Sequence, residues 1–165
     1  MTPQDLFEHL SALNISVERH SHAPLMTVQD SQNLRGTILG HHSKNLFLKD
    51  KKKKLWLVVC HEDLKIDLKA LRFRIGAAGL SFASSNLLQD VLGVQPGSVT
   101  PFAIVHDVEC LVQVVLDINF AKSEQVNFHP LTNTQTLTIS GPDLLKFLDH
   151  HDHNPILIDF SKQPS

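Results

Sequence analysis

Three short polar stretches carry residue types that could act together on a small substrate. Lys44 and Asn45 precede the apolar run LFL, Gly97–Pro101 is the loop GSVTP, and His129–Thr134 is the segment HPLTNT. A lysine can hold a phosphate or carbonyl oxygen through charge-assisted hydrogen bonds, and an asparagine can add a neutral one. Polar residues at strand ends and on loops are typical of a pocket in which backbone amides bind the substrate. The alternatives are a surface lysine, a turn glycine and a core histidine.

The usual signatures of nucleophilic and metal-dependent enzymes are missing from the sequence. It contains no GxSxG elbow, no P-loop and no HExxH motif, and GAAG is too short for a dinucleotide fingerprint. Histidine clusters occur at His20/His22, His41/His42 and His150/His151/His153. The two cysteines lie fifty residues apart, so no compact zinc-ligand spacing exists. We therefore expect surface or helix-capping histidines, no metal and no cofactor.

The composition is that of an ordinary globular protein. Hydrophobic residues make up 42% of the chain and charged residues 19%, which is typical of a globular protein. The length of 165 residues predicts a single domain spanning residues 1–165. No apolar run approaches the ~20 residues of a membrane helix, and the N-terminus has no signal-peptide core. Cys60 and Cys110 stand beside aliphatic residues, which predicts buried free thiols and a reducing compartment. We expect a cytoplasmic monomer with no membrane contact.

A lysine-rich run stands in a chain whose formal net charge is only −2. Five of the six residues from Lys49 to Lys54 are lysine, and alternating apolar residues flank the run on both sides. This pattern predicts a hairpin whose connection stays solvated and resists pairing with other chains. A local contact with nucleic acid is the alternative, because phosphate affinity depends on where the charges lie rather than on the net charge.

Hydrophobic periodicity and capping residues predict helices around a cluster of strands. Thr2 and Pro3 start a first helix, and Ser140 caps a late one. The other predicted helices cover 27–36, 66–76 and 85–93, and the predicted strands cover 15–22, 45–50, 55–59, 80–84, 98–105, 110–120, 125–131, 134–140 and 154–160. Several adjacent strands lack an intervening helix, which favours an α+β fold with a mixed, mostly antiparallel central sheet surrounded by helices.

Four ordered motifs resemble a known family. KNLFLKD (Lys44–Asp50), LSFAS (Leu80–Ser84), LGVQPGSVTPF (Leu92–Phe102) and HPLTNTQT (His129–Thr136) together look like the freestanding prolyl-tRNA editing domains. These are relatives of the insertion domain of bacterial prolyl-tRNA synthetase and of the cysteinyl-tRNA(Pro) deacylases. The resemblance covers nearly the whole chain and implies that family's editing-domain fold.

That resemblance implies hydrolysis of the ester that joins a wrong amino acid to tRNA(Pro), and the motifs are most similar to those of alanyl-tRNA(Pro) deacylases. A synthetase pocket built for proline rejects the smaller alanine weakly, because missing methylenes forfeit only ~1–3 kcal/mol. Cysteine, serine or 2-aminobutyrate esters are alternative substrates. A non-catalytic module that binds tRNA or the synthetase is the alternative from another class.

The resemblance also implies roles for individual residues. Lys44 and Asn45 would hold the substrate's CCA end, and His129 would line the aminoacyl pocket, with the substrate's own 2′-hydroxyl assisting. The family's GxxxP loop corresponds to Gly97, Ser98, Val99, Thr100 and Pro101, where Gly97 allows close backbone approach.

The expected partners are the acceptor end of mischarged tRNA(Pro) and, as an open possibility, prolyl-tRNA synthetase. Lys49 corresponds to a family lysine and is a candidate acceptor-stem contact, with Lys51 and Lys52 adding phosphate attraction. The chain departs from its relatives at Gly79, where they commonly carry a basic residue. Arg72 or Arg74 is the candidate replacement.

Overall fold

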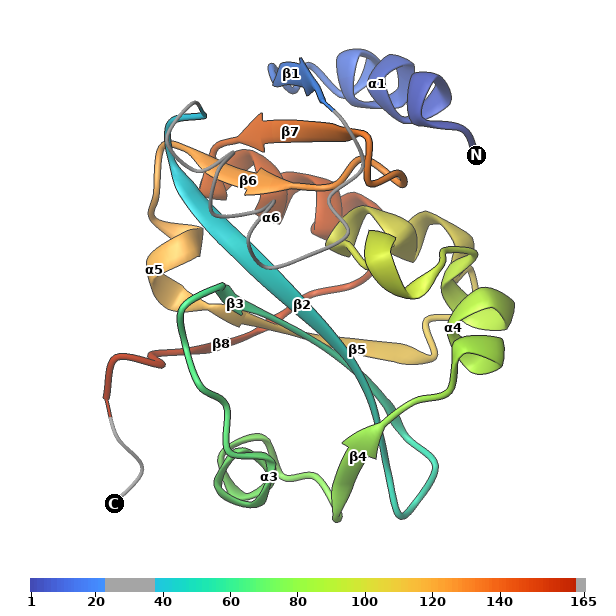
Figure 1. The fold of residues 1–165 in the computed structure, drawn as a ribbon, viewed down its shortest axis with the longest axis vertical. Helices are drawn as coiled ribbons and strands as arrows, with labels where there is room; N and C mark the ends of the chain where they lie inside the picture. The colour runs from blue at the N-terminus through green and yellow to red at the C-terminus, as the bar shows by residue number, and fades with distance from the viewer. Residues whose placement is uncertain (23–37, 163–165) are drawn as a thin grey trace.

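A computed structural model describes residues 1–22 and 38–162, and the helix predicted over 27–36 lies outside the described residues. Figure 1 shows helices lying around one twisted sheet. In chain order the elements, with η for 3₁₀-helices, are α1 (Pro3–Ala12), β1 (Glu18–Ser21), β2 (His41–Asp50), β3 (Leu55–His61), α3 (Leu68–Ile75), β4 (Leu80–Phe82), α4 (Ser85–Leu92), η1 (Pro96–Ser98), η2 (Pro101–His106), β5 (Val112–Asp117), α5 (Ile118–Ala121), β6 (Val126–Phe128), β7 (Gln135–Ile139), α6 (Gly141–His150) and β8 (Ile156–Ile158).

The described strands form one eight-stranded mixed sheet. Its order is β1-β7-β6-β2-β3-β5-β8, and β4 pairs with β2 beside that path. The pairs β1–β7, β6–β7, β2–β3 and β2–β4 are antiparallel, whereas β2–β6, β3–β5 and β5–β8 are parallel. The predicted α+β fold with a mixed, mostly antiparallel sheet is confirmed. Among the described helices, none has the length and apolarity needed to cross a membrane.

Two hydrophobic cores lie on opposite faces of β2 and β3, because successive side chains of a strand alternate in direction. Phe47, Leu57 and Val59 belong to the larger core, which includes buried residues of α4, η2 and α6. The smaller core lies against α3 and comprises Leu48, Trp56, Val58, Leu71, Ile75, Val115 and Ile158. Burying a large apolar side chain contributes roughly 1.5–3 kcal/mol, so both faces of β3 stabilise the centre of the sheet.

The lysine run is the connection of the predicted hairpin, which the structure confirms. Residues 51–54 are all exposed between β2 and β3. The carboxylate of Asp50 organises this turn: it accepts hydrogen bonds of 2.9 to 3.4 Å from the N–H groups of Lys52, Lys54, Trp56 (indole) and Ala78. Burial raises the pKa of Asp50, but these hydrogen bonds outweigh it and hold the pKa below its ordinary value. The charged turn is therefore built around one anionic acceptor.

The strand predicted over 98–105 is wrong, because η1 and η2 occupy this region. Thr100 caps η2 with its hydroxyl, which accepts a hydrogen bond from the Phe102 N–H at 3.4 Å, and Pro101 takes the first helical position. A continuous apolar run does not distinguish a buried strand from a buried helical turn. The capping residue and the proline decide in favour of the helical turn.

Two further expectations need correction around β5. The strand predicted over 110–120 ends at Asp117, whose carboxylate accepts the Asn119 N–H at 2.9 Å and starts α5. Cys60 is a buried free thiol as expected, whereas Cys110 is free but exposed. Cys110 lies just before β5 with a positive φ of 55°.

Candidate functional site

The predicted substrate residues follow the point at which two parallel strands separate. β2 pairs with β6 only through His41–Val126 and His42–Asn127. Beyond this point β2 runs diagonally away from β6 (Figure 1), and the Ser43 hydroxyl donates to the Asn127 carbonyl at 2.7 Å. Lys44 and Asn45 are the next residues along β2, and His129 is the first residue after β6. The topology thus places two of the three sequence motifs around one strand divergence.

Lys44 and Asn45 leave β2 on opposite faces, as neighbours on a strand must. The Lys44 ammonium donates to the carbonyl of Leu64, in the connection between β3 and α3. Asn45 lies on the face of the larger core, and its Nδ2 donates to the Ser43 hydroxyl at 3.3 Å. Its Oδ1 is buried and has no hydrogen-bond partner among the described residues. Asn45 therefore offers an unused acceptor, which suits a donor such as a substrate ammonium.

The GSVTP and HPLTNT loops meet at their exposed ends. A Cβ added at Gly97 would lie 3.6 Å from Nδ2 of Asn133, an ordinary van der Waals distance. Gly97 is exposed, and Ser98 and Val99 are half-buried. Thr100 and Pro101 are fully covered and hold the loop from beneath. Of the five predicted loop residues, the first three are thus accessible to a ligand.

His129 is held in one orientation by the second strand of its own hairpin. Its Nδ1 lies 3.3 Å from the carbonyl of Gln135, which can only accept, so Nδ1 carries the proton and Nε2 of the neutral ring is an acceptor. Burial lowers the pKa of His129, opposed by the Gln135 hydrogen bond and assisted by the nearby His22. His129 is therefore a neutral imidazole at pH 7.

His22 is a neighbour of the site that the sequence did not assign to it. Its backbone N–H donates to the Thr134 carbonyl at 2.9 Å, and its Nε2 lies 2.8 Å from the Thr136 hydroxyl. These contacts follow from the pairing of β1 with β7, a long-range register that no local pattern reveals. The sequence signal that could have pointed to His22 was that the predicted strand 15–22 ends in polar residues.

The thiol nearest the site is not a nucleophile. Cys60 faces Lys44 across the β2–β3 pair. Burial raises the pKa of the Cys60 thiol to about 12, although Lys44 acts in the opposite direction. A thiol of this pKa is protonated at pH 7, and the thiolate is the reactive form.

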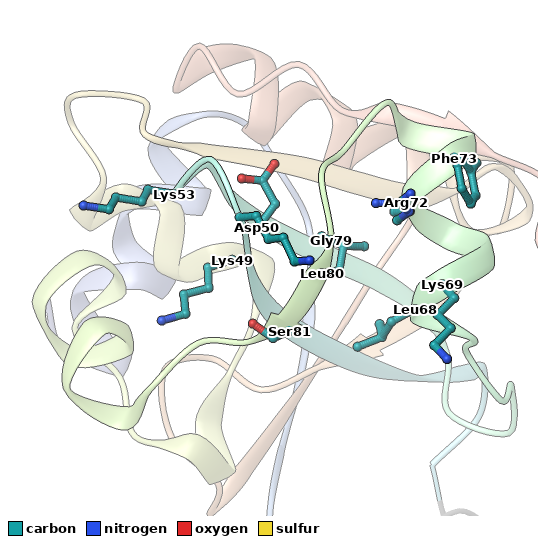
Figure 2. Close-up of a pocket in the computed structure, with 11 residues that line it drawn as sticks. Lys49, Asp50, Lys53, Leu68, Lys69, Arg72, Phe73, Gly79, Leu80 and Ser81 are labelled. Carbon is teal, nitrogen blue, oxygen red and sulfur yellow. The ribbon is translucent and has the colours of Figure 1, made fainter.

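A separate groove of about 720 Å³ lies at the other end of β2, between the hairpin connection and α3. We call it the cationic groove. It is lined by Lys49, Asp50, Lys51, Lys53, Leu68, Lys69, Arg72, Phe73, Gly79, Leu80 and Ser81. Figure 2 shows Lys49 and Lys53 on one side of the β4 segment and Lys69 with Arg72 on the other. Positive side chains therefore approach the groove from two separate elements.

An exposed aromatic ring accompanies these charges. Phe73 is 74% exposed, and the Arg72 guanidinium carbon lies 4.3 Å from the centre of its ring. An accessible aromatic face beside basic groups suits a nucleobase and its phosphate.

The structure separates the predicted tRNA-binding residues. Lys49 and Lys51 line the cationic groove, whereas Lys52 is not one of its lining residues. At Gly79 the stem of Lys51 covers the backbone, because an added Cβ would lie 2.9 Å from Lys51 Cε. Lys51 thus lies where a side chain at position 79 would begin.

Of the two candidate arginines, only Arg72 lines the groove. Arg74 donates to the Asp159 carbonyl at 2.9 Å and fixes the C-terminal segment instead.

The groove and the strand divergence are joined by β2 itself. Lys49 lies five positions after Lys44, which corresponds to about 17 Å along an extended strand. A stacked nucleic-acid strand rises about 3.4 Å per nucleotide, so this span equals about five nucleotides. A single-stranded 3′ end could therefore reach from the groove to Lys44.

Comparison of the sequence with known proteins gives consistent matches. A family model described as the aminoacyl-tRNA editing domain matches residues 22–147. The prolyl-tRNA synthetase associated domain-containing protein 1 of Bos taurus is 39% identical over 162 residues, covering 95% of this chain and 94% of that protein. The prolyl-tRNA editing protein ProX of Acetoanaerobium sticklandii is 36% identical over 146 residues, covering 88% and 89%.

Solved structures match the fold. The crystal structure of hypothetical protein APE2540 gives a TM-score of 0.74 at 18% identity, covering 93% of this chain and 97% of that one. A structure described as a candidate trans-editing enzyme for prolyl-tRNA synthetase gives a TM-score of 0.67 at 17% identity, covering 94% and 92%. Identities this low establish a shared fold and no more.

Proposed function

Because the chain belongs to the aminoacyl-tRNA editing domain family, we propose that it is a trans-editing deacylase that hydrolyses mischarged alanyl-tRNA(Pro). The observation that carries the proposal is that Lys44, Asn45 and His129 all follow the point at which β2 and β6 separate, with Lys44 and Asn45 on opposite faces of β2. A Cβ added at Gly97 would lie 3.6 Å from Asn133 of the HPLTNT loop, which supports placing both loops at one site. Names of relatives that refer to prolyl-tRNA synthetase favour tRNA(Pro) as the substrate and the synthetase as a partner.

The chemistry proposed here uses no enzyme nucleophile. Water attacks the ester carbonyl, the bond between that carbon and the ribose oxygen breaks, and the proton passes to the ribose oxygen. Lys44 would hold the CCA end or the carbonyl oxygen, and loop amides near Gly97 would stabilise the developing oxyanion. The Oδ1 of Asn45, which has no partner among the described residues, would accept a hydrogen bond from the α-ammonium group of the amino acid. Neutral His129 would line the aminoacyl pocket, and the substrate's 2′-hydroxyl would assist the proton transfer.

The test is a deacylation assay with tRNA(Pro) charged separately with alanine, cysteine, serine, 2-aminobutyrate and proline. Rapid release of alanine with prolyl-tRNA(Pro) intact is the expected result, because the pocket would exclude proline by size. Faster release of cysteine, serine or 2-aminobutyrate would overturn the alanine assignment and keep the deacylase. Failure to hydrolyse any of the five esters would overturn the proposal that the protein is an enzyme. The remaining hypothesis would be a non-catalytic module that binds tRNA or the synthetase.

Gly97→Ala is expected to fold normally and to lose activity. An added methyl group meets only Asn133, at 3.6 Å, among the described atoms, so the melting temperature should stay unchanged. If substrate approaches the Gly97 backbone closely, the same methyl group displaces it, and a misplacement of ~1 Å costs roughly a hundredfold. Thermal melts and kcat/KM measured on the same preparation check both parts. Unchanged kcat/KM would remove Gly97 from the site.

We further propose that the cationic groove binds the acceptor stem, with Lys49 and Lys51 contacting phosphates and Lys52 contributing long-range attraction. Five basic side chains line this groove, which begins at Lys49, five positions beyond Lys44 on β2. The position of Lys51 over Gly79 would let that lysine supply the positive charge that position 79 lacks. Arg72 and exposed Phe73 would contact the unpaired 3′ end.

The salt dependence of tRNA binding tests this groove. The plot of log K against log salt has a negative slope. Removing one lysine that neutralises a phosphate should make this slope shallower by about 0.7–0.9, so Lys49→Ala with Lys51→Ala should make it shallower by about 1.4–1.8. Turnover at saturating substrate should change little, because neither lysine reaches the ester. Lys146→Ala, an exposed lysine on α6, is the matched control and should leave the slope unchanged. An unaltered slope in the double variant would place the tRNA elsewhere.

A further inference from the structure

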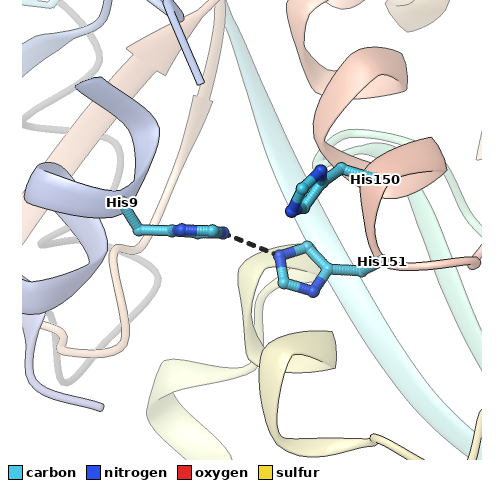
Figure 3. A group of neighbouring side chains, drawn as sticks. All are labelled: His9, His150 and His151. Atoms are coloured by element: carbon cyan, nitrogen blue, oxygen red, sulfur yellow. Dashed lines mark hydrogen bonds between the residues drawn. The ribbon is translucent and has the colours of Figure 1, made fainter. Parts of the chain in front are cut away.

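Three histidines from the two ends of the chain meet beside the C-termini of two helices. His9 lies in the last turn of α1, His150 is the last residue of α6, and His151 is the C-cap of α6. Nε2 of His9 lies 2.8 Å from Nε2 of His151, although the two residues are 142 positions apart. One ring nitrogen of each histidine lies within 4.8 Å of those of the other two. Figure 3 shows the rings of His150 and His151 turned toward His9.

We propose that His9, His150 and His151 form a binding site for a divalent transition metal of the zinc class, which ties α1 to α6. No described acidic residue or thiol belongs to the group, so its ligand set consists of imidazoles alone. Imidazole ligands suit zinc, copper and nickel rather than magnesium or calcium. The sequence predicted surface or helix-capping histidines, because no local pattern shows that His9 lies beside the C-terminal run.

The spacing of the rings needs only small side-chain rotations to hold an ion. Tetrahedral zinc with Zn–N distances of about 2.0–2.1 Å places its ligand nitrogens about 3.3–3.4 Å apart. The 2.8 Å separation of His9 from His151 is below this value, and the 4.8 Å limit for the group is above it. His150 is exposed, so an ion can enter from solvent, and water can take the fourth position.

The surroundings favour a cation. Helix C-termini carry partial negative charge, and the last turns of α1 and α6, both ten residues long, supply all three ligands.

A buried hydrogen-bond chain fixes the segment that carries His151. The carbonyl of His151 lies 2.6 Å from Nδ1 of His153, and Nε2 of His153 lies 2.9 Å from the Asp107 carboxylate. The ring of Phe147 packs 4.8 Å from that of His151, centre to centre. Ligands held by hydrogen bonds and packing lose less freedom on binding, which favours a specific site over incidental surface binding.

The experiment is a titration of the full chain, produced without a histidine tag and stripped of metal, with zinc chloride. We expect one ion per chain with micromolar affinity and a rise of several degrees in melting temperature, since the ion binds only the folded protein. His9→Gln and His150→Gln should each weaken zinc binding at least about tenfold and remove the rise. Cobalt in place of zinc should give the visible absorption of a four-coordinate site in the wild type alone.

Controls separate this site from general histidine binding. His20→Gln, on β1, should retain the stoichiometry and affinity of the wild type, and so should Cys110→Ser, which removes the exposed thiol. His9 and His150 are partly or fully exposed, so both glutamine variants should fold, as circular dichroism will show. Unchanged affinity in His9→Gln, or absence of saturable zinc binding in the wild type, would overturn the proposal. Neither result depends on whether the protein deacylates tRNA.

Discussion

Lys44→Ala is expected to abolish hydrolysis of alanyl-tRNA(Pro), with a fall in kcat/KM of about a hundredfold to a thousandfold. If Lys44 holds the carbonyl oxygen, the substitution removes a donor to that oxygen as it becomes negative, and loss of one such donor costs this much in other hydrolases. Lys44 also stands beside Asn45 and Cys60, and neither can replace its positive charge, because the Cys60 thiol is neutral and the Asn45 amide uncharged. Single-turnover deacylation of purified alanyl-tRNA(Pro) measures the effect on the chemical step.

The fold should survive this substitution. In the structure the Lys44 ammonium donates to one backbone carbonyl, that of half-buried Leu64, and losing one such hydrogen bond costs roughly 0.5–1.5 kcal/mol. Lys65→Ala is the matched control, because it removes an exposed lysine next to that carbonyl and should keep full activity. Wild-type turnover in Lys44→Ala would exclude Lys44 from catalysis and return it to a structural role in the β3–α3 connection.

Asp107→Ala is expected to produce the largest loss of stability, about 3–5 kcal/mol. The Asp107 carboxylate accepts the backbone N–H groups of Leu111 and Val112 at 3.0 and 2.9 Å and pairs with His153 Nε2 at 2.9 Å. The side chains of Asp107 and His153 are only 2% and 1% exposed. Removing the carboxylate would leave buried donors without partners where water does not reach.

Chemical denaturation measures this loss, with a double-variant cycle to isolate the pair. Asp107→Ala and His153→Ala should each destabilise the chain, and the double variant should lose less than the sum of the two. Asp90→Ala, an exposed aspartate on α4, is the control and should change the free energy of unfolding by less than about 0.5 kcal/mol. A loss under about 1 kcal/mol in Asp107→Ala would mean that water enters and satisfies the donors.

Local chemistry in the sequence determined most of the elements. Ser140 starts α6 by accepting the Asp143 N–H, and Gly93 ends α4 with a positive φ of 67°. The apolar segments on either side of the lysine run predicted the β2–β3 hairpin, because a strand–turn–strand pattern depends on a few neighbouring residues. β3 itself is buried on both faces and shows no period of two in its burial. The apolar run 102–104 misled the strand prediction, since burial on all sides erases the period that distinguishes strand from helix.

The candidate site could be predicted residue by residue but not as an arrangement. Lys44, Gly97 and His129 stood out by type and order, yet only the parallel pairing of β2 with β6 shows that Lys44 and His129 follow the same strand divergence. Sequence alone did not place His22 beside His129 or lay Lys51 over Gly79, because both contacts depend on strand register and side-chain direction.

The histidine cluster shows most clearly what the tertiary structure decided. The sequence predicted surface or helix-capping histidines in the C-terminal run HHDH, and the helix predicted to start at Thr2 and Pro3 gave no role to His9. Each interpretation was sound for an isolated segment, because helix periodicity says which face a residue lies on and nothing about its neighbour across a fold. Packing of the two helix ends brings nitrogens 142 residues apart to hydrogen-bond distance. Interactions between residues close in sequence determine the helices and strands. Burial of the apolar faces of these helices and strands against one another determines which distant side chains meet.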